Sequence, residues 1–421
     1  MYKRCGCRDG VTGRQLGVRC ARLAEAGHGR WYFAVQVPGV DGRRARVRQG
    51  GYATRADAER ACWQVQDLPG PQAQVRTWTV RRWLEFWLSE VQGRLRPSTV
   101  RSYRTIVYQH LIPQLGRERL SKLRTVQVQR AMDAISRQRV RDGRLISPGT
   151  VNRIRAVLRS SLNEARRRGM IGHNPAWRLR LPNGARPHAV VWDDHREQVW
   201  RETGLRPAVA VWDLKHLARF LEAVRDDPLF ALWWLVALRG PRRGEIAGLR
   251  WEDIDLAAAE LSIKEQVIVV GGKEYLGPPK SPAGVRTLAL DEATVAILWE
   301  LWRAQGQLLG RVPSGRVFRH RDGRPVRPDW VTRRFAALVK LLGLPPVRLH
   351  DLRHGAASVA AAAGVDLKVI QHDIGHSSAV TTADTYVSVF RQVAAAAARA
   401  SAELLLSHAR IRLSLEGAAQ A

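Results

Sequence analysis

The sequence predicts a mainly α fold with small β-sheets, an α+β architecture spread over more than one domain. Apolar residues recur at helical spacing between clear start and stop signals, above all between residues 97 and 169. Short runs rich in β-branched and aromatic residues lie at 31–49 and 261–290, and these favour strands. The chain has 421 residues, which is enough for two or three domains.

The first module, about residues 1–70, is predicted to be a small sheet packed on one helix. Residues 31–37 have strand composition, and a turn at 38–42 leads to a basic strand at 43–49. Thr54 then begins a helix with apolar residues on one face. Such a sheet fits a DNA groove, but its arginines could equally face only solvent, and the pattern leaves both interpretations open.

Three of the four cysteines lie in this module together with a histidine. Cys5, Cys7 and Cys20 precede His28 in a stretch rich in Gly and Arg. Three thiolates and one imidazole could form a tetrahedral zinc site, and the alternative is free thiols in a reducing compartment. Four cysteines in a chain of this length do not make a disulfide scaffold. Cys62 follows a helical pattern and is predicted to be a small core residue.

A helical module is predicted for residues 75–181. Its helices begin at Pro97, at Thr125 and at Ser147–Pro148, and residues 78–91 supply a fourth. Basic residues recur opposite the apolar stripes of these helices: Arg101, Arg104, Arg153, Arg155, Arg159, Arg166 and Arg167. A charged face usually only contacts water, but an excess of one sign is more than solubility requires.

The rest of the chain is divided by composition. Residues 182–211 contain Pro, Gly and charges with weak periodicity, so they are predicted to be a linker with one short helix at 193–200. A third module spans 212–400, with strands near 261–270 and 286–290, and a tail occupies 401–421. Residues 389–408 are predicted to form a helix that is too apolar to be stable in isolation. This helix would pack either within its own chain or on a neighbouring copy, and both possibilities stay open.

The net charge of the chain indicates what kind of molecule it binds. The formal net charge is +31 and the pI is near 11.4, so the chain attracts polyanions, and salt-sensitive binding to nucleic acid is the leading interpretation over an anionic membrane surface. No apolar run reaches transmembrane length, and the N-terminus lacks the apolar core of a signal peptide. A cytoplasmic location is therefore expected.

The most informative motif lies near the C-terminal end. His350 and Arg353 stand three residues apart on one predicted helix (349–363), His376 follows a turn at Gly375, and Tyr386 lies on a third short helix. A tyrosine becomes a good nucleophile when a neighbour takes its proton and cationic donors surround the electrophile. The motif therefore indicates attack on a phosphate.

In this order and spacing, HxxR, the GHSS turn and the tyrosine resemble the tyrosine recombinases of the phage-integrase type. The stretch 238–251 resembles the TGxRxxE segment of that family, with Arg242 as its first arginine and Glu245 orienting it. Arg239 stands where the family usually has threonine. Lys280, in the turn before strand 286–290, resembles the lysine that reaches the DNA minor groove. Arg243 and Arg286 are the alternatives for these two roles.

The resemblance implies a mechanism that needs neither ATP nor a catalytic metal. Tyr386 would attack a backbone phosphate to give a 3′-phosphotyrosine, while Arg242 and Arg353 bind its non-bridging oxygens. His350 would draw the phenolic proton, and His376 would hydrogen-bond a phosphate oxygen. Lys280 would protonate the departing 5′ oxygen.

The resemblance also implies partners and a place of action. Residues 1–70 would bind arm-type DNA sites, residues 75–181 would clamp the crossover duplex, and four copies would assemble as a homo-tetramer with a DNA-bending or directionality accessory protein. The site of action would be the bacterial nucleoid. Three alternatives stay open: a DNA-binding protein without catalysis, a type IB topoisomerase, and a metal-dependent phosphohydrolase whose ligands would come from His350, Asp351, His354, His372, Asp373 and His376.

Overall fold

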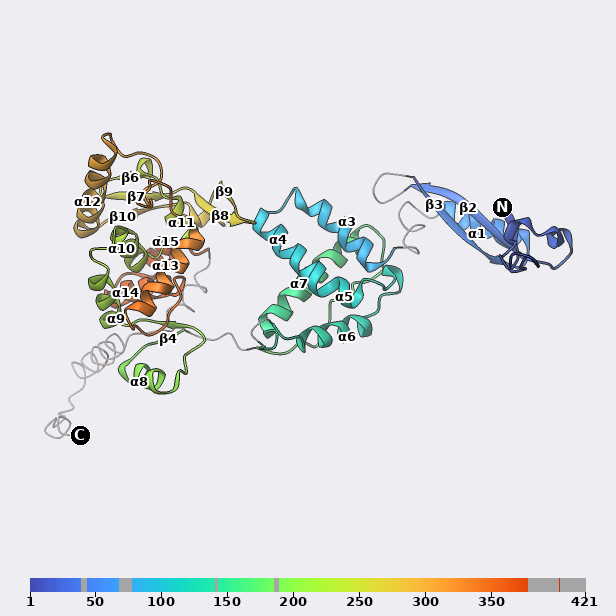
Figure 1. Ribbon diagram of the computed structural model, residues 1–421, viewed down its shortest axis with the longest axis horizontal. Coiled ribbons are helices and arrows are strands. Elements are labelled where there is room, and N and C mark those ends of the chain that lie inside the picture. Colours follow the sequence, from blue (N-terminus) through green and yellow to red (C-terminus); the bar gives the residue numbers. More distant parts are fainter. Residues whose placement is uncertain (39–43, 68–77, 141–142, 185–188, 378–400, 402–421) are drawn as a thin grey trace. The chain divides into compact units, whose positions relative to one another are not determined.

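The computed structural model describes residues 1–38, 44–67, 78–140, 143–184, 189–377 and 401 (Figure 1). The chain divides into two compact units, residues 1–185 and 186–421. Helices dominate both units and the sheets have two or three strands each, so the predicted α+β class is confirmed. Within the described ranges, none of the helices combines the length and apolar character needed to cross a bilayer.

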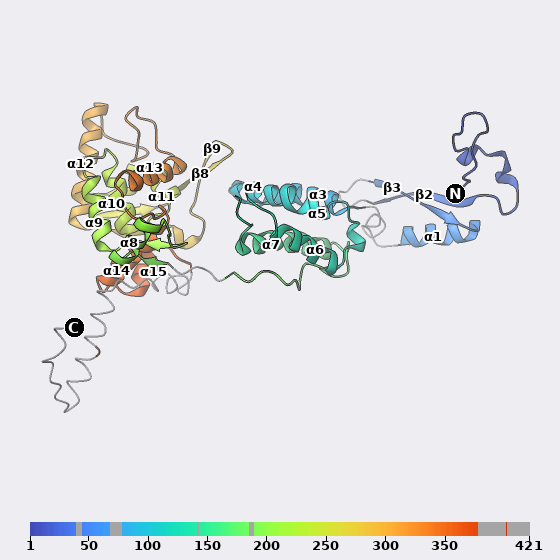
Figure 2. The same cartoon turned by 60° about the horizontal axis from the view of Figure 1, so that its bottom comes forward.

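The first unit begins with a three-stranded antiparallel sheet. Strands β1 (Tyr2–Arg4), β2 (Arg30–Pro38) and β3 (Arg44–Tyr52) lie in that order, and helix α1 (Arg55–Asp67) packs on one face of the sheet (Figure 2). The small core between them includes Phe33, Val37, Val47 and Val65. The sequence predicted β2, β3 and α1 but not β1, which is only three residues long.

A helical bundle follows in the same unit. It consists of α3 (Val80–Gln92), α4 (Pro97–Ile106), α5 (Ile112–Leu115), α6 (Thr125–Ser136) and α7 (Pro148–Arg167). Pro97 and Pro148 stand in the first turns, where a missing N–H costs nothing, and the hydroxyl of Ser147 accepts a hydrogen bond from the Thr150 amide. The predicted first residues of α4, α6 and α7 agree with the structure, except that Arg124 rather than Thr125 is the cap of α6.

The described part of the second unit combines helices with three small sheets. Its helices are α8 (Asp194–Thr203), α9 (Leu214–Ala223), α10 (Phe230–Arg239), α11 (Arg243–Gly248), α12 (Glu292–Leu309), α13 (Pro328–Leu341), α14 (Asp351–Ala362) and α15 (Leu367–Ile374). Strands β10 (Arg286–Ala289), β7 (Glu260–Ile263) and β6 (Ile254–Asp255) form an antiparallel sheet in that order. Strands β8 (Gln266–Val270) and β9 (Lys273–Gly277) form a hairpin, of which only β8 was predicted.

Aromatic side chains fill the centre of this unit. Phe220, Trp233 and Phe335 are almost fully buried, and their ring centroids lie between 5.4 and 6.2 Å apart. They join helices α9, α10 and α13, so these three helices form one rigid support.

From residue 190 onward, the structure differs from the prediction of a linker at 182–211. Strands β4 (Val190–Val191) and β5 (Ala210–Val211) pair in parallel around α8, and the buried Trp192 belongs to the core of the second unit. The indole N–H groups of Trp192 and Trp212 donate to the carbonyls of Pro346 and Pro345, at 3.4 and 2.8 Å. The expected helix is α8, which begins and ends slightly later than predicted.

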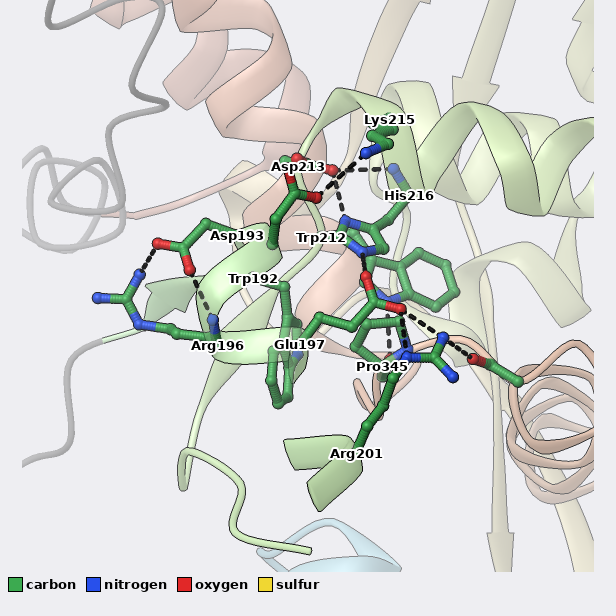
Figure 3. Close-up of polar contacts among 12 residues, drawn as sticks. Trp192, Asp193, Arg196, Glu197, Arg201, Trp212, Asp213, Lys215, His216 and Pro345 are labelled. Atoms are coloured by element: carbon green, nitrogen blue, oxygen red, sulfur yellow. Dashed lines mark hydrogen bonds and ion pairs between the residues drawn. The ribbon is translucent and has the colours of Figure 1, made fainter. Parts of the chain in front are cut away.

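A buried histidine fixes this segment further (Figure 3). His216 is fully buried, and its Nδ1 and Nε2 lie 2.5 Å from Asp213 Oδ1 and 2.7 Å from Glu197 Oε2. Since both ring nitrogens face carboxylate oxygens, both carry protons and the ring is an imidazolium. Burial alone would lower the pKa of His216, but the two carboxylates outweigh that effect and raise it.

Candidate active site

Arg242 is held at the N-terminus of α11. Helix α10 ends at Gly240, whose left-handed backbone (φ 57°) turns the chain, and Arg242 then caps α11. The Glu245 carboxylate accepts from the Arg242 backbone N–H at 3.0 Å and from its Nη1 at 2.7 Å. Arg242 Nη2 donates to the Gly375 carbonyl at 2.9 Å, which joins α11 to the end of α15. Arg243, the alternative in the sequence, instead lies beside Thr332 on an exposed surface.

Arg286 belongs to a buried hydrogen-bond network that also includes Arg242 and Glu245. From β10, its Nη2 donates to Glu245 at 3.0 Å, its Nε to the Asp373 carbonyl at 2.7 Å and its Nη1 to the Gly284 carbonyl at 2.8 Å. Its side chain is 1% exposed, and each of its three nitrogens donates to an acceptor inside the protein. Arg286 therefore cannot take the DNA-contacting role that the sequence left open for it.

Glu245 is the anion at the centre of this network. Burial opposes its ionisation, but the charges of Arg286 and Arg242 outweigh that effect and hold its pKa below the usual range. One buried carboxylate thus orients two guanidinium groups. The sequence assigned only Arg242 to it. The alternation in β10 was a usable signal for the second, because Arg286 shares the inward face of that strand with the buried Leu288.

Arg353 approaches the same place from α14. It is 3% exposed, and its Nη1 donates to the Gly240 carbonyl at 2.7 Å. Its Nη2 is buried and has no hydrogen-bond partner among the described residues. Burial first, and then the charge of Arg242, lowers the pKa of Arg353 to about 9, which leaves it protonated at neutral pH. A buried cationic donor without a partner is suited to an incoming anion.

The two histidines of the motif flank these arginines. His350 directly precedes α14, one turn before Arg353, and its ring makes an edge contact with that of His354 at 5.6 Å between centroids. His376 follows Gly375, the left-handed residue that ends α15, and is therefore next to the carbonyl that Arg242 binds. Arg242, His350, Arg353 and His376 are thus brought together from three segments of the chain.

Both histidines are neutral at physiological pH. Although part of the His350 ring is exposed, loss of water around it lowers its pKa to about 4, and the charges of His354 and Arg353 act in the same direction. Burial, followed by the charges of Arg353 and Arg242, lowers the pKa of His376 to about 4. A neutral imidazole can accept a proton, and its protonated nitrogen can donate to an oxyanion.

The structure does not place the two remaining predicted residues, Lys280 and Tyr386, in this centre. Lys280 is exposed in the connection between β9 and β10, shortly before the turn Pro282–Gly284. Among the described residues, its side chain makes no hydrogen bond to the arginines of this centre. Tyr386 lies outside the described residues, as does the predicted helix at 389–408 except for residue 401.

The ligands that a metal-dependent phosphohydrolase would need are not gathered in the described part of the chain. Asp351 is engaged by Arg348, whose Nε and Nη2 both donate to it at 2.8 Å. Within the described residues, the one group of His, Cys, Asp and Glu placed to share a metal ion is Cys5, Cys7, Cys20 and His28. That cluster belongs to the first unit and not to this centre.

Two family models match the chain. The model described as "Phage integrase family" covers residues 214–392, and that described as "Phage integrase, N-terminal SAM-like domain" covers residues 79–136. The first includes every residue of the centre described above.

Individual relatives agree with this match. The chain is 29% identical over 189 residues to the ICEBs1 integrase of Bacillus subtilis, a match that covers 43% of this chain and 51% of that relative. It is 25% identical over 389 residues to the putative prophage phiRv2 integrase of Mycobacterium tuberculosis, covering 87% and 91% of the two chains.

Solved structures show the same fold. A Tn1549 transposon integrase in complex with a circular intermediate DNA aligns with a TM-score of 0.59 and 18% identity, covering 78% of this chain and 99% of that one. A lambda integrase dimer bound to a COC′ core site aligns with a TM-score of 0.52 and 16% identity, covering 84% and 92%. With the arginine and histidine centre in the matched segment, these likenesses lead to one conclusion: the chain belongs to the phage integrase family of tyrosine recombinases.

Proposed function

We propose that this chain cuts and rejoins duplex DNA at specific sites through a covalent 3′-phosphotyrosine, and so integrates or excises a mobile element. The observation that carries the proposal is the buried Nη2 of Arg353, which has no hydrogen-bond partner among the described residues and lies close enough to Arg242 and His376 for their charges to interact. Together these side chains offer the cationic and neutral donors that one phosphodiester needs, and the solved structures with this fold include complexes with DNA.

Each residue has a defined task in this proposal. Tyr386 attacks phosphorus, the bond to the 5′ oxygen breaks, and the phosphate stays on the tyrosine. Arg242 and Arg353 stabilise the charge on the non-bridging oxygens, and neutral His350 takes the phenolic proton. His376 donates to a phosphate oxygen, and Lys280 gives a proton to the departing 5′ oxygen. The energy of the broken bond is kept in the phosphotyrosine, so neither ATP nor a catalytic metal is used.

We further propose how the regions of the chain share the work. Residues 1–70 bind arm-type DNA sites, residues 75–181 bind the core site, and residues 212–400 carry out catalysis. Recombination joins two duplexes and cuts four strands, which requires a homo-tetramer, with a DNA-bending or directionality protein selecting integration or excision. The place of action is the bacterial nucleoid. Cys5, Cys7, Cys20 and His28 hold a structural zinc ion.

The test uses a nicked duplex spanning the junction where the element that encodes this chain joins its host DNA. Wild-type protein should form an adduct that survives denaturing electrophoresis, and Tyr386→Phe should form none while still binding the duplex. An adduct with Tyr386→Phe would disprove the assignment of the nucleophile.

A modified substrate separates the role of Lys280 from those of the arginines. A 5′-bridging phosphorothiolate leaves as a thiolate, which needs no proton from a general acid. This substrate should restore cleavage by Lys280→Ala but not by Arg353→Ala. Equal restoration of both variants would contradict the proposed division of tasks.

A further inference from the structure

The cysteine and histidine cluster has the dimensions of an occupied zinc site. The ligand atoms of Cys5, Cys7, Cys20 and His28 all lie within 4.8 Å of one another. The Cys7 and Cys20 sulfurs are 3.4 and 3.6 Å from His28 Nε2. Zn–S bonds of about 2.3 Å and Zn–N bonds of about 2.0 Å at a tetrahedral angle place sulfur and nitrogen about 3.5 Å apart. All the cysteines are free, so no disulfide accounts for the arrangement.

The surrounding segment has almost no apolar core of its own. Among residues 1–29, only Gly17 and Cys20 are buried. Short segments without an apolar core commonly depend on a bound metal for their fold. The donor set, three sulfurs and one imidazole nitrogen, is a closed structural set for Zn²⁺ that leaves no ligand position for a substrate.

The position of the cluster links it to the sheet. Cys5 directly follows β1, and His28 lies just before β2, so the four ligands close the long connection between these two strands. Strand β1 pairs with β2 through only three residue pairs, Tyr2 with Tyr32, Lys3 with Trp31 and Arg4 with Arg30. A ladder of this length does not offset the entropy of closing such a connection, and a metal ion at its base would.

Strand β1 contributes to the sheet face opposite α1, which we call the open sheet face. The strand register assigns nine residues with described side chains to this face: Tyr2, Arg4, Arg30, Tyr32, Ala34, Gln36, Arg46, Arg48 and Gly50. Its four arginines are exposed, and no carboxylate is among the nine. The face therefore carries an uncompensated positive charge, which is complementary to a phosphate backbone.

An aromatic stack joins β1 to the rest of this face. The rings of Tyr2 and Tyr32 are stacked, with centroids 5.7 Å apart. A Cβ at Gly50 would lie 1.7 Å from the Tyr32 ring, so glycine in β3 leaves the space in which that ring lies. Loss of β1 would remove Tyr2 and Arg4 and would leave Tyr32 without its partner.

We propose that Zn²⁺ bound by Cys5, Cys7, Cys20 and His28 holds β1 on the sheet and thereby controls the affinity of the open sheet face for duplex DNA, without influence on the active site. This inference extends the proposed arm-site binding by making it dependent on metal. Apo protein would form the covalent adduct on a short core duplex but would bind poorly to a longer fragment that includes arm sites.

The experiment measures metal, DNA affinity and adduct formation separately on the full chain, purified under reducing conditions. Cys7→Ser is compared with Cys62→Ser, which removes a cysteine outside the cluster, on α1. Wild type and Cys62→Ser should each contain one zinc per chain, and after Co²⁺ exchange they should show thiolate charge-transfer and tetrahedral absorption bands. Cys7→Ser should lose both signals.

DNA affinity is then measured on a long junction fragment and on the short core duplex. Cys7→Ser should bind the long fragment at least tenfold more weakly and the core duplex within twofold of wild type, with normal adduct formation. Arg46→Ala with Arg48→Ala should retain zinc and lose the same affinity. The inference is overturned by wild-type protein without zinc, by equal metal content in Cys7→Ser and Cys62→Ser, or by zinc-free protein with full affinity for the long fragment. Absence of the adduct in wild type would instead contradict the proposed catalysis, whatever the metal content.

Discussion

Replacing Glu245 with glutamine removes a fully buried carboxylate that faces two guanidinium groups, those of Arg242 and Arg286. Glu245 is fully buried, and it accepts from Arg242 at 2.7 and 3.0 Å and from Arg286 at 3.0 Å. Glutamine has nearly the same size but carries no charge, and its NH₂ group would point at a cationic donor. The substitution therefore leaves buried positive charge without compensation.

The expected loss of stability is large. Removing one partner of a buried ion pair costs about 3–5 kcal/mol. For a domain of about 150–250 residues, each kcal/mol corresponds to about 2–4 °C in Tm, so the second unit should melt about 6–20 °C lower. Binding of DNA should recover part of this loss, because its phosphate supplies negative charge beside Arg242.

The assay is thermal unfolding of the full chain at neutral pH, followed by circular dichroism with and without DNA. Glu300→Gln is the matched control, because Glu300 is 65% exposed and faces Arg225 at 3.6 Å. A surface pair of this kind contributes about 1 kcal/mol or less. A Tm for Glu245→Gln within 2 °C of the control would refute the reasoning.

The pH dependence of the same comparison has a defined sign. The pKa of Glu245 is lowered in the folded state, so its contribution is present above the pKa of the unfolded carboxyl and is lost as the pH falls through the lowered value. The difference in Tm between wild type and Glu245→Gln should therefore shrink only in strong acid.

Three further outcomes are expected. Arg353→Lys should slow single-turnover cleavage of the nicked duplex by about 10²–10³-fold, because lysine lacks the planar fork whose Nη1 binds the Gly240 carbonyl while the separate Nη2 is left for a phosphate oxygen; a rate within threefold of wild type would contradict this. The pKa of His216 is raised, so its contribution to stability is present below the unfolded pKa and is lost as the pH rises through the folded one; His216→Gln should flatten this alkaline decline in Tm, and an unchanged slope would disprove the assignment. Trp192→Ala should destabilise the second unit by about 3–5 kcal/mol in denaturant unfolding, whereas Trp299→Ala, at a 45% exposed site, should cost far less.

Much of the fold could be predicted because its signals are local. The hydroxyl cap and first-turn proline at Ser147–Pro148 set the start of α7, and the glycines at 364 and 375 mark the ends of α14 and α15. Arg242, His350, Arg353 and His376 were found for a related reason, since each belongs to a short motif whose spacing is visible in the sequence. Their roles in catalysis remain predictions until the variants are measured.

The parts that were missed depend on contacts between distant segments. The region 190–211 has the composition of a linker, yet Trp192 and Trp212 find their carbonyl partners at Pro346 and Pro345. No local pattern indicates such a partner. For the same reason, the role of Arg286 was not predicted, because its acceptors lie at Glu245 and at the end of α15.

Gly240 has a consequence for directed evolution of this enzyme. Its backbone is left-handed, and a Cβ there would lie 3.2 Å from both the Arg353 Cα and the Ala356 Cβ. Its carbonyl also accepts a hydrogen bond from the Arg353 guanidinium, so any side chain would displace Arg353 while straining the turn that leads to Arg242. Libraries that seek new target sequences should keep codon 240 fixed and place their diversity elsewhere.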